Sequence, residues 1–229
     1  MGELWHGLVD AVHLIVSRDP EVVDVTWRSL RISVASTILA ALICIPLGGL
    51  ISFRSFPGKR LLISVTQTLY SIPTVCVGLF VYLMVSHAGP LGSLDLVFTP
   101  AAMVIAQMLL IMPVLLGLTI SALSGVDKSI KDTTLSLGAT EFQAIWAILK
   151  EARFAIVAAV LLGFGRAISE VGVAMIVGGN LWRYTRVLTT AISQLTTEGE
   201  FAMAMALGII LIAVALIVNI VVGVVQQRR

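Results

Sequence analysis

The sequence predicts an all-α integral membrane protein with about five transmembrane helices. Of its 229 residues, 58% are hydrophobic and only 12% are charged, whereas about a quarter of the residues in a soluble domain carry a charge. Five apolar segments are each long enough to cross the roughly 30 Å hydrocarbon core of a bilayer. A lipid bilayer is therefore the expected environment. The small and dispersed net charge of +2 argues against a nucleic-acid partner.

Residues 1–24 form a separate N-terminal element in this prediction. Apolar residues such as Leu4, Leu8 and Ile15 recur at helical spacing between residues 3 and 17. This segment is too short and too polar to span a bilayer, so we expect an amphipathic helix lying on the extracytoplasmic surface. Residues 18–21, Arg-Asp-Pro-Glu, are typical of a turn before the first span.

The five predicted spans differ in the helix breakers that they contain. They cover approximately residues 32–53, 61–85, 100–123, 154–177 and 201–225. Pro46 loosens the end of the first span, and Pro73 and Pro113 free backbone groups in the second and third. At Pro73 two interpretations remain open: a wall or gate of a transport pathway, or an ordinary proline kink. Gly178 and Gly179 end the fourth span.

A mixed polar and apolar segment, residues 132–151, separates the third span from the fourth. Gly138 predicts a break between two short helices in this segment. Apolar residues recur at helical spacing in the second of them, at Phe142, Ile145, Trp146 and Leu149. The pattern indicates an amphipathic helix pair at a membrane surface.

The distribution of basic residues predicts the orientation of the spans. Five spans place the two termini on opposite sides of the membrane. If residues 132–151 are cytoplasmic, nine of the fifteen lysine and arginine residues lie inside, five lie outside, and Arg166 lies within a span. The inside residues are Arg54, Lys59, Arg60, Lys128, Lys131, Lys150, Arg153, Arg228 and Arg229. This bias predicts an extracytoplasmic N-terminus and a cytoplasmic C-terminus.

Two charged residues within the fourth span are candidates for a functional site. Arg166 lies near the middle of the membrane if the helix rises about 1.5 Å per residue, and a charge there is costly unless it is paired or faces water. Glu170 follows four residues later on the same helical face, so we expect an ion pair. Either the pair makes the bundle rigid, or Arg166 contributes positive potential to an anion pathway while Glu170 orients it.

Absent motifs argue against an enzyme. The sequence contains no GxxxxGK[ST] phosphate loop, no HExxH pair and no Gly-x-Ser-x-Gly elbow. Cys44 and Cys76 each lie in an apolar run, as small hydrophobic residues do. His6 and His13 lack a third metal ligand nearby. We therefore expect the chain to bind neither a cofactor nor a metal ion.

Residues 132–151 resemble the cytoplasmic coupling loop of ABC-importer permeases. The family signature is Glu-Ala-Ala, three residues, Gly, nine residues, Ile, one residue and Leu-Pro. The matching positions are Asp132, Thr133, Thr134, Gly138 and Ile148. Lys150 and Glu151 stand at the Leu-Pro positions, so the end of the signature is absent. The resemblance implies that this loop, about residues 125–152, couples the chain to an ATPase.

The family assigns roles to positions within the loop. The residues implied in coupling are Asp132, Thr133, Thr134, Gly138, Ala139 and Ile148. Gly138 would provide the break that lets the first short helix enter a groove of the ATPase. Asp132 would lie near the start of that helix, where a carboxylate suits the helix dipole or caps the first turn.

The resemblance covers nearly the whole chain and is most specific for the branch of the family that carries oxyanions. It rests on TWRSLRISVASTILAALICIPLGG, SIPTVCVGL, GRAISEVGVAMIVGGN and YTRVLTTAI. This branch transports molybdate, tungstate and sulfate, and the short five-span form is most similar to its tungstate permeases. Residues 25–229 would then form a transmembrane domain with the type I ABC-importer permease fold.

The family also implies partners and a pathway. Two copies of the chain would form a homodimer, two ABC ATPase subunits would hold ATP and Mg²⁺, and an extracytoplasmic binding protein would deliver the oxyanion to the cytoplasmic membrane of a prokaryote. The candidate pathway residues are Ser71, Pro73, Thr74, Arg166, Ser169 and Glu170. The alternatives are the same fold carrying molybdate or sulfate, or a self-sufficient secondary transporter. The latter would show inverted repeats, and the sequence has no such internal symmetry.

Overall fold

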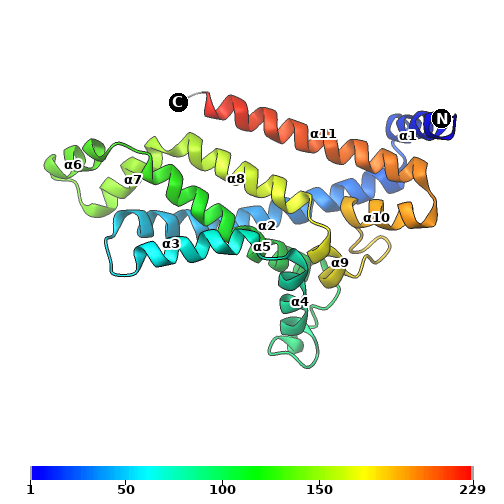
Figure 1. The fold of residues 1–229 in the computed structure, drawn as a ribbon, viewed down its shortest axis with the longest axis horizontal. Coiled ribbons are helices and arrows are strands. Elements are labelled where there is room, and N and C mark those ends of the chain that lie inside the picture. The colour runs from blue at the N-terminus through cyan, green and yellow to red at the C-terminus, as the bar shows by residue number, and fades with distance from the viewer. Residues whose placement is uncertain (1, 228–229) are drawn as a thin grey trace.

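The computed structural model describes residues 2–227, and among them the regular structure is helical, without strands. The long helices of the bundle run along its long axis (Figure 1). They are α2 (Pro20–Phe53), α5 (Pro100–Ser124), α8 (Arg153–Ile168) and α11 (Phe201–Gln226). Three of these, α2, α5 and α11, are long and apolar enough to cross a bilayer as continuous helices. The third and fifth predicted spans are confirmed to within a few residues.

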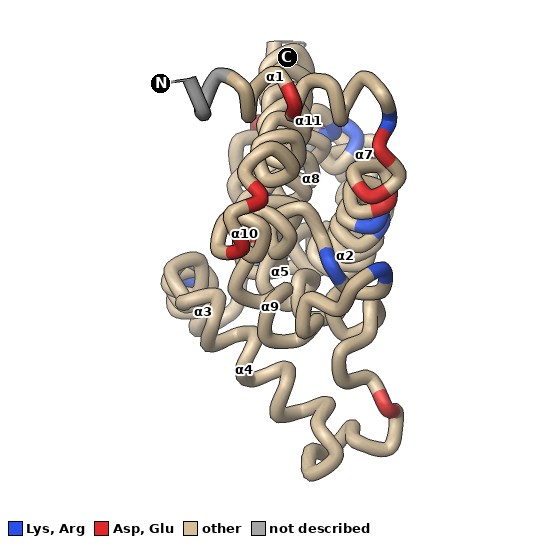
Figure 2. Tube along the Cα trace, turned by 90° about the vertical axis from the view of Figure 1, so that its right-hand side faces the viewer, with Lys and Arg blue, Asp and Glu red and all other residues tan. Residues whose placement is uncertain are grey.

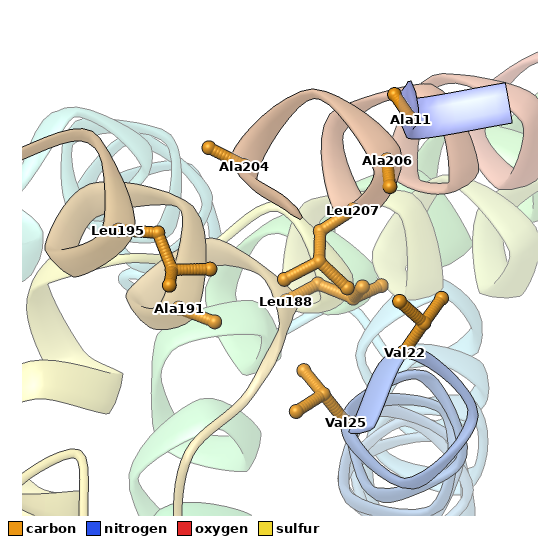
Figure 3. Close-up of a cluster of buried hydrophobic side chains, with 9 residues drawn as sticks. All are labelled: Ala11, Val22, Val25, Leu188, Ala191, Leu195, Ala204, Ala206 and Leu207. Atoms are coloured by element: carbon orange, nitrogen blue, oxygen red, sulfur yellow. The ribbon is translucent and has the colours of Figure 1, made fainter. Parts of the chain in front are cut away.

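The N-terminal helix α1 (Gly2–Val16) is confirmed and packs against the beginning of α11. Gly7 permits this close approach, because a Cβ atom there would lie 2.5 Å from the Cε atom of Met205. Ala11 is fully buried in the same contact. Figure 3 shows that Ala11 belongs to a cluster in which Val22 of α2, Leu207 of α11 and side chains of α10 (Leu188–Glu198) also meet.

The first span begins about twelve residues earlier than predicted, at Pro20. The Asp19 carboxylate caps this helix by accepting hydrogen bonds from the backbone N–H groups of Glu21 (2.9 Å) and Val22 (3.2 Å). Proline is favoured at the first helical position because its missing N–H would have no intrahelical partner there. The charged segment before residue 32 is therefore helical and belongs to α2. The apolar run alone could not predict this earlier start of the helix.

The second predicted span is two helices and not one. α3 (Lys59–Thr68) continues into a 3₁₀ turn, η1 (Leu69–Ser71), and α4 (Thr74–Val85) then leaves at 98°. Ile72 is extended (φ −62°, ψ 131°), as expected for the residue before Pro73, whose ring excludes helical geometry there. The predicted second span, residues 61–85, is thus a broken one, sharply bent at Pro73, where the sequence predicted a perturbed helix.

The fourth predicted span is also broken. α8 ends at Ile168, and α9 (Gly172–Gly178) follows after a bend of 60°. Gly179, at φ +65°, ends α9. Figure 2 shows α4 and α9 next to each other and free of charged residues, whereas charged residues are visible on α10 and near the start of α2.

The two ends of the bundle carry different elements. α6 (Lys128–Ser136) and α7 (Glu141–Glu151) form a hairpin at the end where α11 finishes, and α1 and α10 lie at the opposite end (Figure 1). A short 3₁₀ turn, η2 (Gly92–Leu94), lies in the loop after α4. Arg228 and Arg229, counted above among the inside charges, lie outside the described residues. Which end faces the cytoplasm stays a prediction.

Candidate functional site: a helical hairpin and two broken spans

The α6–α7 hairpin has caps that fix both sides of its turn. Leu137 ends α6, and Gly138 follows at φ +85°. The Gly138 N–H donates to the Leu135 carbonyl (3.0 Å), and the Ala139 N–H donates to the Thr134 carbonyl (3.2 Å). This pair of bonds is the Schellman motif, in which glycine takes the left-handed position at little cost. The predicted helix break at Gly138 is confirmed.

α7 begins with a reciprocal cap. The Gln143 N–H donates to the Thr140 hydroxyl (3.3 Å), and the Thr140 N–H donates to the Gln143 side-chain oxygen (2.8 Å). Such a capping box satisfies two donors that the first turn of a helix leaves free. The turn of the hairpin is therefore closed by local hydrogen bonds on both sides.

Asp132 does not lie at the start of α6, so the predicted cap role is wrong. Asp127 holds that position and accepts a hydrogen bond from the Ser129 N–H (2.8 Å). This bond holds the pKa of the Asp127 carboxyl below its ordinary value. Asp132 lies one turn further on, is exposed, and lines a cavity of about 370 Å³ together with Ser52 and Ile148.

One face of α7 is buried and anchors the hairpin to the bundle. Ala144 and Ile148 are almost completely buried. Ile148 packs in a cluster with Leu123 of α5 and Ile156 of α8. Of the residues matched to the coupling signature, Ile148 is thus a structural anchor, and it links the hairpin mechanically to two of the long helices.

The other side of the hairpin exposes large apolar side chains. Leu137 is 83% exposed, Phe142 is 77% exposed and Trp146 is 65% exposed. We call these three residues the hairpin surface. Sequence periodicity predicted Phe142 and Trp146 on one stripe with Ile145 and Leu149, but the latter two are partly buried. Leu137 was missed, because one apolar residue in a turn gives no periodic signal.

The two broken spans meet at their breaks. A Cβ atom on Gly172, the first residue of α9, would lie 3.0 Å from the Thr74 hydroxyl at the start of α4. One turn further along α4, a Cβ atom on Gly78 would lie 3.2 Å from the Cα atom of Val173. Two of the predicted pathway segments, which are distant in sequence, are therefore in direct contact.

The predicted ion pair between Arg166 and Glu170 does not form, because α8 ends between them. Arg166 is exposed near the end of α8. The Glu170 side chain is buried, and its Oε1 atom accepts a hydrogen bond from the Val173 N–H (3.2 Å) in the first turn of α9. The Thr189 hydroxyl donates to the Glu170 carbonyl oxygen (2.7 Å). Glu170 thus fixes the break between α8 and α9.

The remaining predicted pathway residues lie beside these breaks. Ser71 and Ser169 are both exposed, and each precedes the start of a short helix. The Ser169 hydroxyl donates to the Gly165 carbonyl of the preceding turn. Ser71, Arg166 and Ser169 are thus each exposed on one of the two broken spans.

We expect Glu170→Gln to keep the bend of the fourth span and Glu170→Ala to weaken it. Glutamine retains a carbonyl oxygen that can accept the Val173 N–H, whereas alanine leaves that donor unpaired, at a cost of about 1 kcal/mol. In thermal unfolding of the detergent-solubilised protein, the glutamine variant should have the same melting temperature as the unsubstituted protein, and the alanine variant a lower one. Equal loss in both variants would contradict the capping role.

A third polar feature lies at the opposite end of the bundle. A pocket of about 360 Å³ is lined by Glu21 and Asp24 of α2 and by Trp182, Arg183 and Arg186 of the loop before α10. The Arg186 guanidinium lies 3.5 Å from the Glu21 carboxylate and stacks 4.7 Å from the Trp182 ring centre. Sequence patterns did not indicate this pocket, because pairing between residues far apart in sequence leaves no local pattern. Among the described residues, no group of three potential metal ligands occurs.

Comparison with known proteins identifies the family. The model for binding-protein-dependent transport system inner membrane components matches residues 44–229. The tungstate uptake system permease protein of Peptoclostridium acidaminophilum is 41% identical over 228 residues, covering 100% of both chains. The corresponding protein of Campylobacter jejuni is 37% identical and covers 95% of this chain and 91% of its own length. A sulfate transport system permease protein of Synechococcus elongatus is more distant, with 24% identity over 88% of this chain and 76% of its own length.

The fold is shared with solved transporters. A bacterial alginate ABC transporter, crystallised in complex with an alginate-bound periplasmic protein, contains a chain that covers all of this one with a TM-score of 0.70 and 17% identity, over 88% of its own length. This likeness supports the type I permease fold predicted from sequence. The chain therefore belongs to the family of inner-membrane components of binding-protein-dependent transport systems, as a permease subunit of an ABC transporter.

Proposed function

We propose that the chain is the permease subunit of a binding-protein-dependent importer that moves tungstate across the cytoplasmic membrane by ATP-driven alternating access. The similarity to tungstate uptake permeases over the full length of the chain carries the substrate assignment. The lower identity of the sulfate permeases ranks sulfate behind tungstate. Molybdate remains the nearest alternative, because it is a tetrahedral dianion like tungstate.

The hairpin surface is the proposed contact with an ABC ATPase. Leu137, Phe142 and Trp146 are largely exposed at the end of the bundle, and large exposed apolar groups of this kind favour a protein interface. The hairpin is anchored through Ile148 to α5 and α8. Movement of two ATPase subunits that hold ATP and Mg²⁺ would therefore be transmitted to the spans.

The transport pathway is proposed to run beside the breaks of the second and fourth spans, between two copies of the chain. Arg166 is exposed on α8, which forms a broken candidate span together with α9, and a charge facing hydrocarbon costs about 3 kcal/mol on insertion scales. A homodimer with a hydrated pathway along its axis would relieve this cost. The arginine would also attract an anionic substrate, with Ser71, Thr74 and Ser169 as hydrogen-bond donors.

The same arrangement suggests the topology. If the hairpin meets an ATPase, its end of the bundle is cytoplasmic, and α11 finishes at that end (Figure 1). α1 and the polar pocket at Arg186 would then face the extracytoplasmic side of the inner membrane, where a binding protein docks. Labelling of single cysteines placed in α1 and in the hairpin with a membrane-impermeant reagent tests this orientation.

Reconstitution in proteoliposomes tests the proposed function. The chain is combined with its ATPase and with its binding protein, and ATP hydrolysis is measured with tungstate, molybdate or sulfate. We expect tungstate-loaded binding protein to give the largest stimulation at the lowest concentration. Stimulation by molybdate or sulfate alone would assign the other oxyanion. Substrate uptake without any ATPase would contradict the ABC mechanism and favour a secondary transporter.

A matched pair of glycine substitutions tests the turn of the hairpin. Gly138→Ala places a Cβ atom on a residue at φ +85°, which costs about 1 kcal/mol. Gly125→Ala changes a glycine at φ −81°, where the nearest atom to the new Cβ lies 3.6 Å away. We expect the first variant to lower oxyanion-stimulated ATP hydrolysis several-fold and the second to leave it unchanged. Equal activities would show that the conformation of Gly138 is not needed for coupling.

A further inference from the structure

Four polar residues share one exposed side of α3 and of the 3₁₀ turn η1 that continues it. They are Arg60, Ser64, Gln67 and Ser71. Their intervals of four, three and four residues bring them to one side of a helix. Each of the four is exposed, and among residues 2–227 none of their side chains forms a hydrogen bond or an ion pair. We call these four residues the α3 polar face.

The other sides of α3 have a different character. Thr66 is buried and Tyr70 is partly buried on the side that packs against α5, where the Tyr70 hydroxyl lies against Gly117. On a third side, Val65 is 47% exposed and Leu69 is 39% exposed. A helix with one apolar and one polar exposed side turns the first toward lipid or protein and the second toward water.

The contact with α5 places α3 at the depth of a membrane span. Gly117 lies seven residues before the end of α5 at Ser124, and therefore about 10 Å from the hairpin end of that candidate span. The α3 polar face extends over about 16 Å, from Arg60 near the hairpin end to Ser71 at the break. This is roughly half of a 30 Å hydrocarbon core. An exposed polar face of this length is stable in a membrane only where water reaches it.

The chemistry of the face suits a passing anion. No aspartate or glutamate occurs between Asp24 and Asp95, so α3 carries no carboxylate beside Arg60. Ser64, Gln67 and Ser71 add two hydroxyl groups and a carboxamide, which are neutral hydrogen-bond donors. One positive charge with neutral donors attracts an anion without holding it tightly, as conduction requires.

We propose that the α3 polar face lines the half of the transport pathway nearer the hairpin, where Ser64 and Gln67 donate hydrogen bonds to the oxyanion. The inference rests on the proposed function and extends its pathway. The breaks of the two spans meet where the Thr74 hydroxyl lies against Gly172. From there the α3 polar face leads along the bundle to the hairpin end (Figure 1).

Uptake into proteoliposomes tests the contact with the oxyanion. Ser64→Ala combined with Gln67→Leu should lower the rate of tungstate uptake roughly ten-fold, because each substitution removes one hydrogen bond to the anion. Val65→Leu, on the apolar side of the same helix, should leave uptake unchanged. Both variants should remain in complex with the ATPase on size-exclusion chromatography. Unchanged uptake in the double variant would overturn the contact.

Labelling of single cysteines shows which side of α3 meets water. The assembled complex, with the two native cysteines of this chain replaced, is placed in nanodiscs and treated with an anionic methanethiosulfonate. Ser64→Cys and Gln67→Cys should react at least about ten-fold faster than Val65→Cys and Leu69→Cys, because the reactive thiolate forms in water and not in hydrocarbon. Equal rates on both sides, or no labelling of either side, would overturn the inference.

The nucleotide state separates a pathway from a surface in bulk water. ATP with vanadate holds an ABC ATPase dimer closed, and alternating access then closes the half of the pathway nearer the hairpin. Labelling of Ser64→Cys and Gln67→Cys should slow several-fold, and rates that do not change would overturn the inference. ATP hydrolysis by the same nanodiscs before vanadate is added tests the proposed function separately. If hydrolysis were absent, the proposed function would fail, and the labelling ratio would still decide whether the α3 polar face lines water.

Discussion

Phe142→Asp combined with Trp146→Asp is expected to abolish oxyanion-stimulated ATP hydrolysis and transport. Both side chains are largely exposed on α7, so the substitutions remove little packing within the chain. Buried aromatic residues at protein interfaces contribute about 2 kcal/mol or more each, which corresponds to a roughly 30-fold loss of affinity per residue. Loss of the ATPase from the purified complex on size-exclusion chromatography measures the effect directly.

Conservative substitutions at the same two positions provide the control. Phe142→Leu combined with Trp146→Phe keeps an apolar surface and should retain most of the ATPase in the complex. Normal thermal unfolding of the aspartate variant would show that its own fold is intact. A complex that stays assembled and active with two aspartates on α7 would remove the hairpin surface from the mechanism.

Gly117→Ala is expected to disturb the broken second span and to lower transport strongly. The Tyr70 hydroxyl lies against Gly117 of α5, so that an added Cβ atom would overlap the hydroxyl oxygen and come within 2.7 Å of Cζ. Tyr70 belongs to η1, directly before the bend at Pro73. Overpacking of this kind typically costs about 1–3 kcal/mol, which lowers the melting temperature by a few degrees in a chain of this size.

A second substitution separates the clash from any intrinsic effect of alanine. Tyr70→Leu removes the ring and should restore stability in the background of Gly117→Ala. Gly163→Ala is the matched control, because the nearest atom to its new Cβ is 4.0 Å away on a neighbouring span. If the double variant were no more stable than Gly117→Ala alone, the contact of Tyr70 with Gly117 would not be the cause.

The extent to which sequence predicted this fold depends on whether a feature is local. The hairpin turn was predictable from local sequence. A glycine between two helical stretches, such as Gly138, often takes the left-handed conformation that ends a helix. The number of apolar segments was also predictable from hydropathy. The early start of α2 was not, since helices continue beyond the hydrocarbon core wherever a cap such as Asp19 stabilises them.

The structure of the candidate pathway was not predictable, because it depends on contacts between residues far apart in sequence. Spacing alone places Arg166 and Glu170 on one helical face, but the helix ends at Ile168. The end depends on contacts that lie far away in sequence, including the hydrogen bond from Thr189 to the Glu170 carbonyl. Likewise, Pro73 indicated a perturbed helix, but the 98° angle depends on the packing of α4 against α9.

The hydroxyl groups of α2 bear on how the chain is assembled during synthesis. α2 has its most extensive packing with α5, yet α3 and α4 leave the ribosome before α5 does. In the folded chain, Ser29 and Thr37 donate to the carbonyl groups of Val25 (2.8 Å) and Ser33 (2.6 Å) on their own helix, and these bonds need no residue of α5. A helix that satisfies its own hydroxyl groups can remain in lipid without cost from unpaired donors. When α5 arrives, Gln107 comes within 3.2 Å of the Ser36 hydroxyl, so this contact can mark the correct pairing of the two helices.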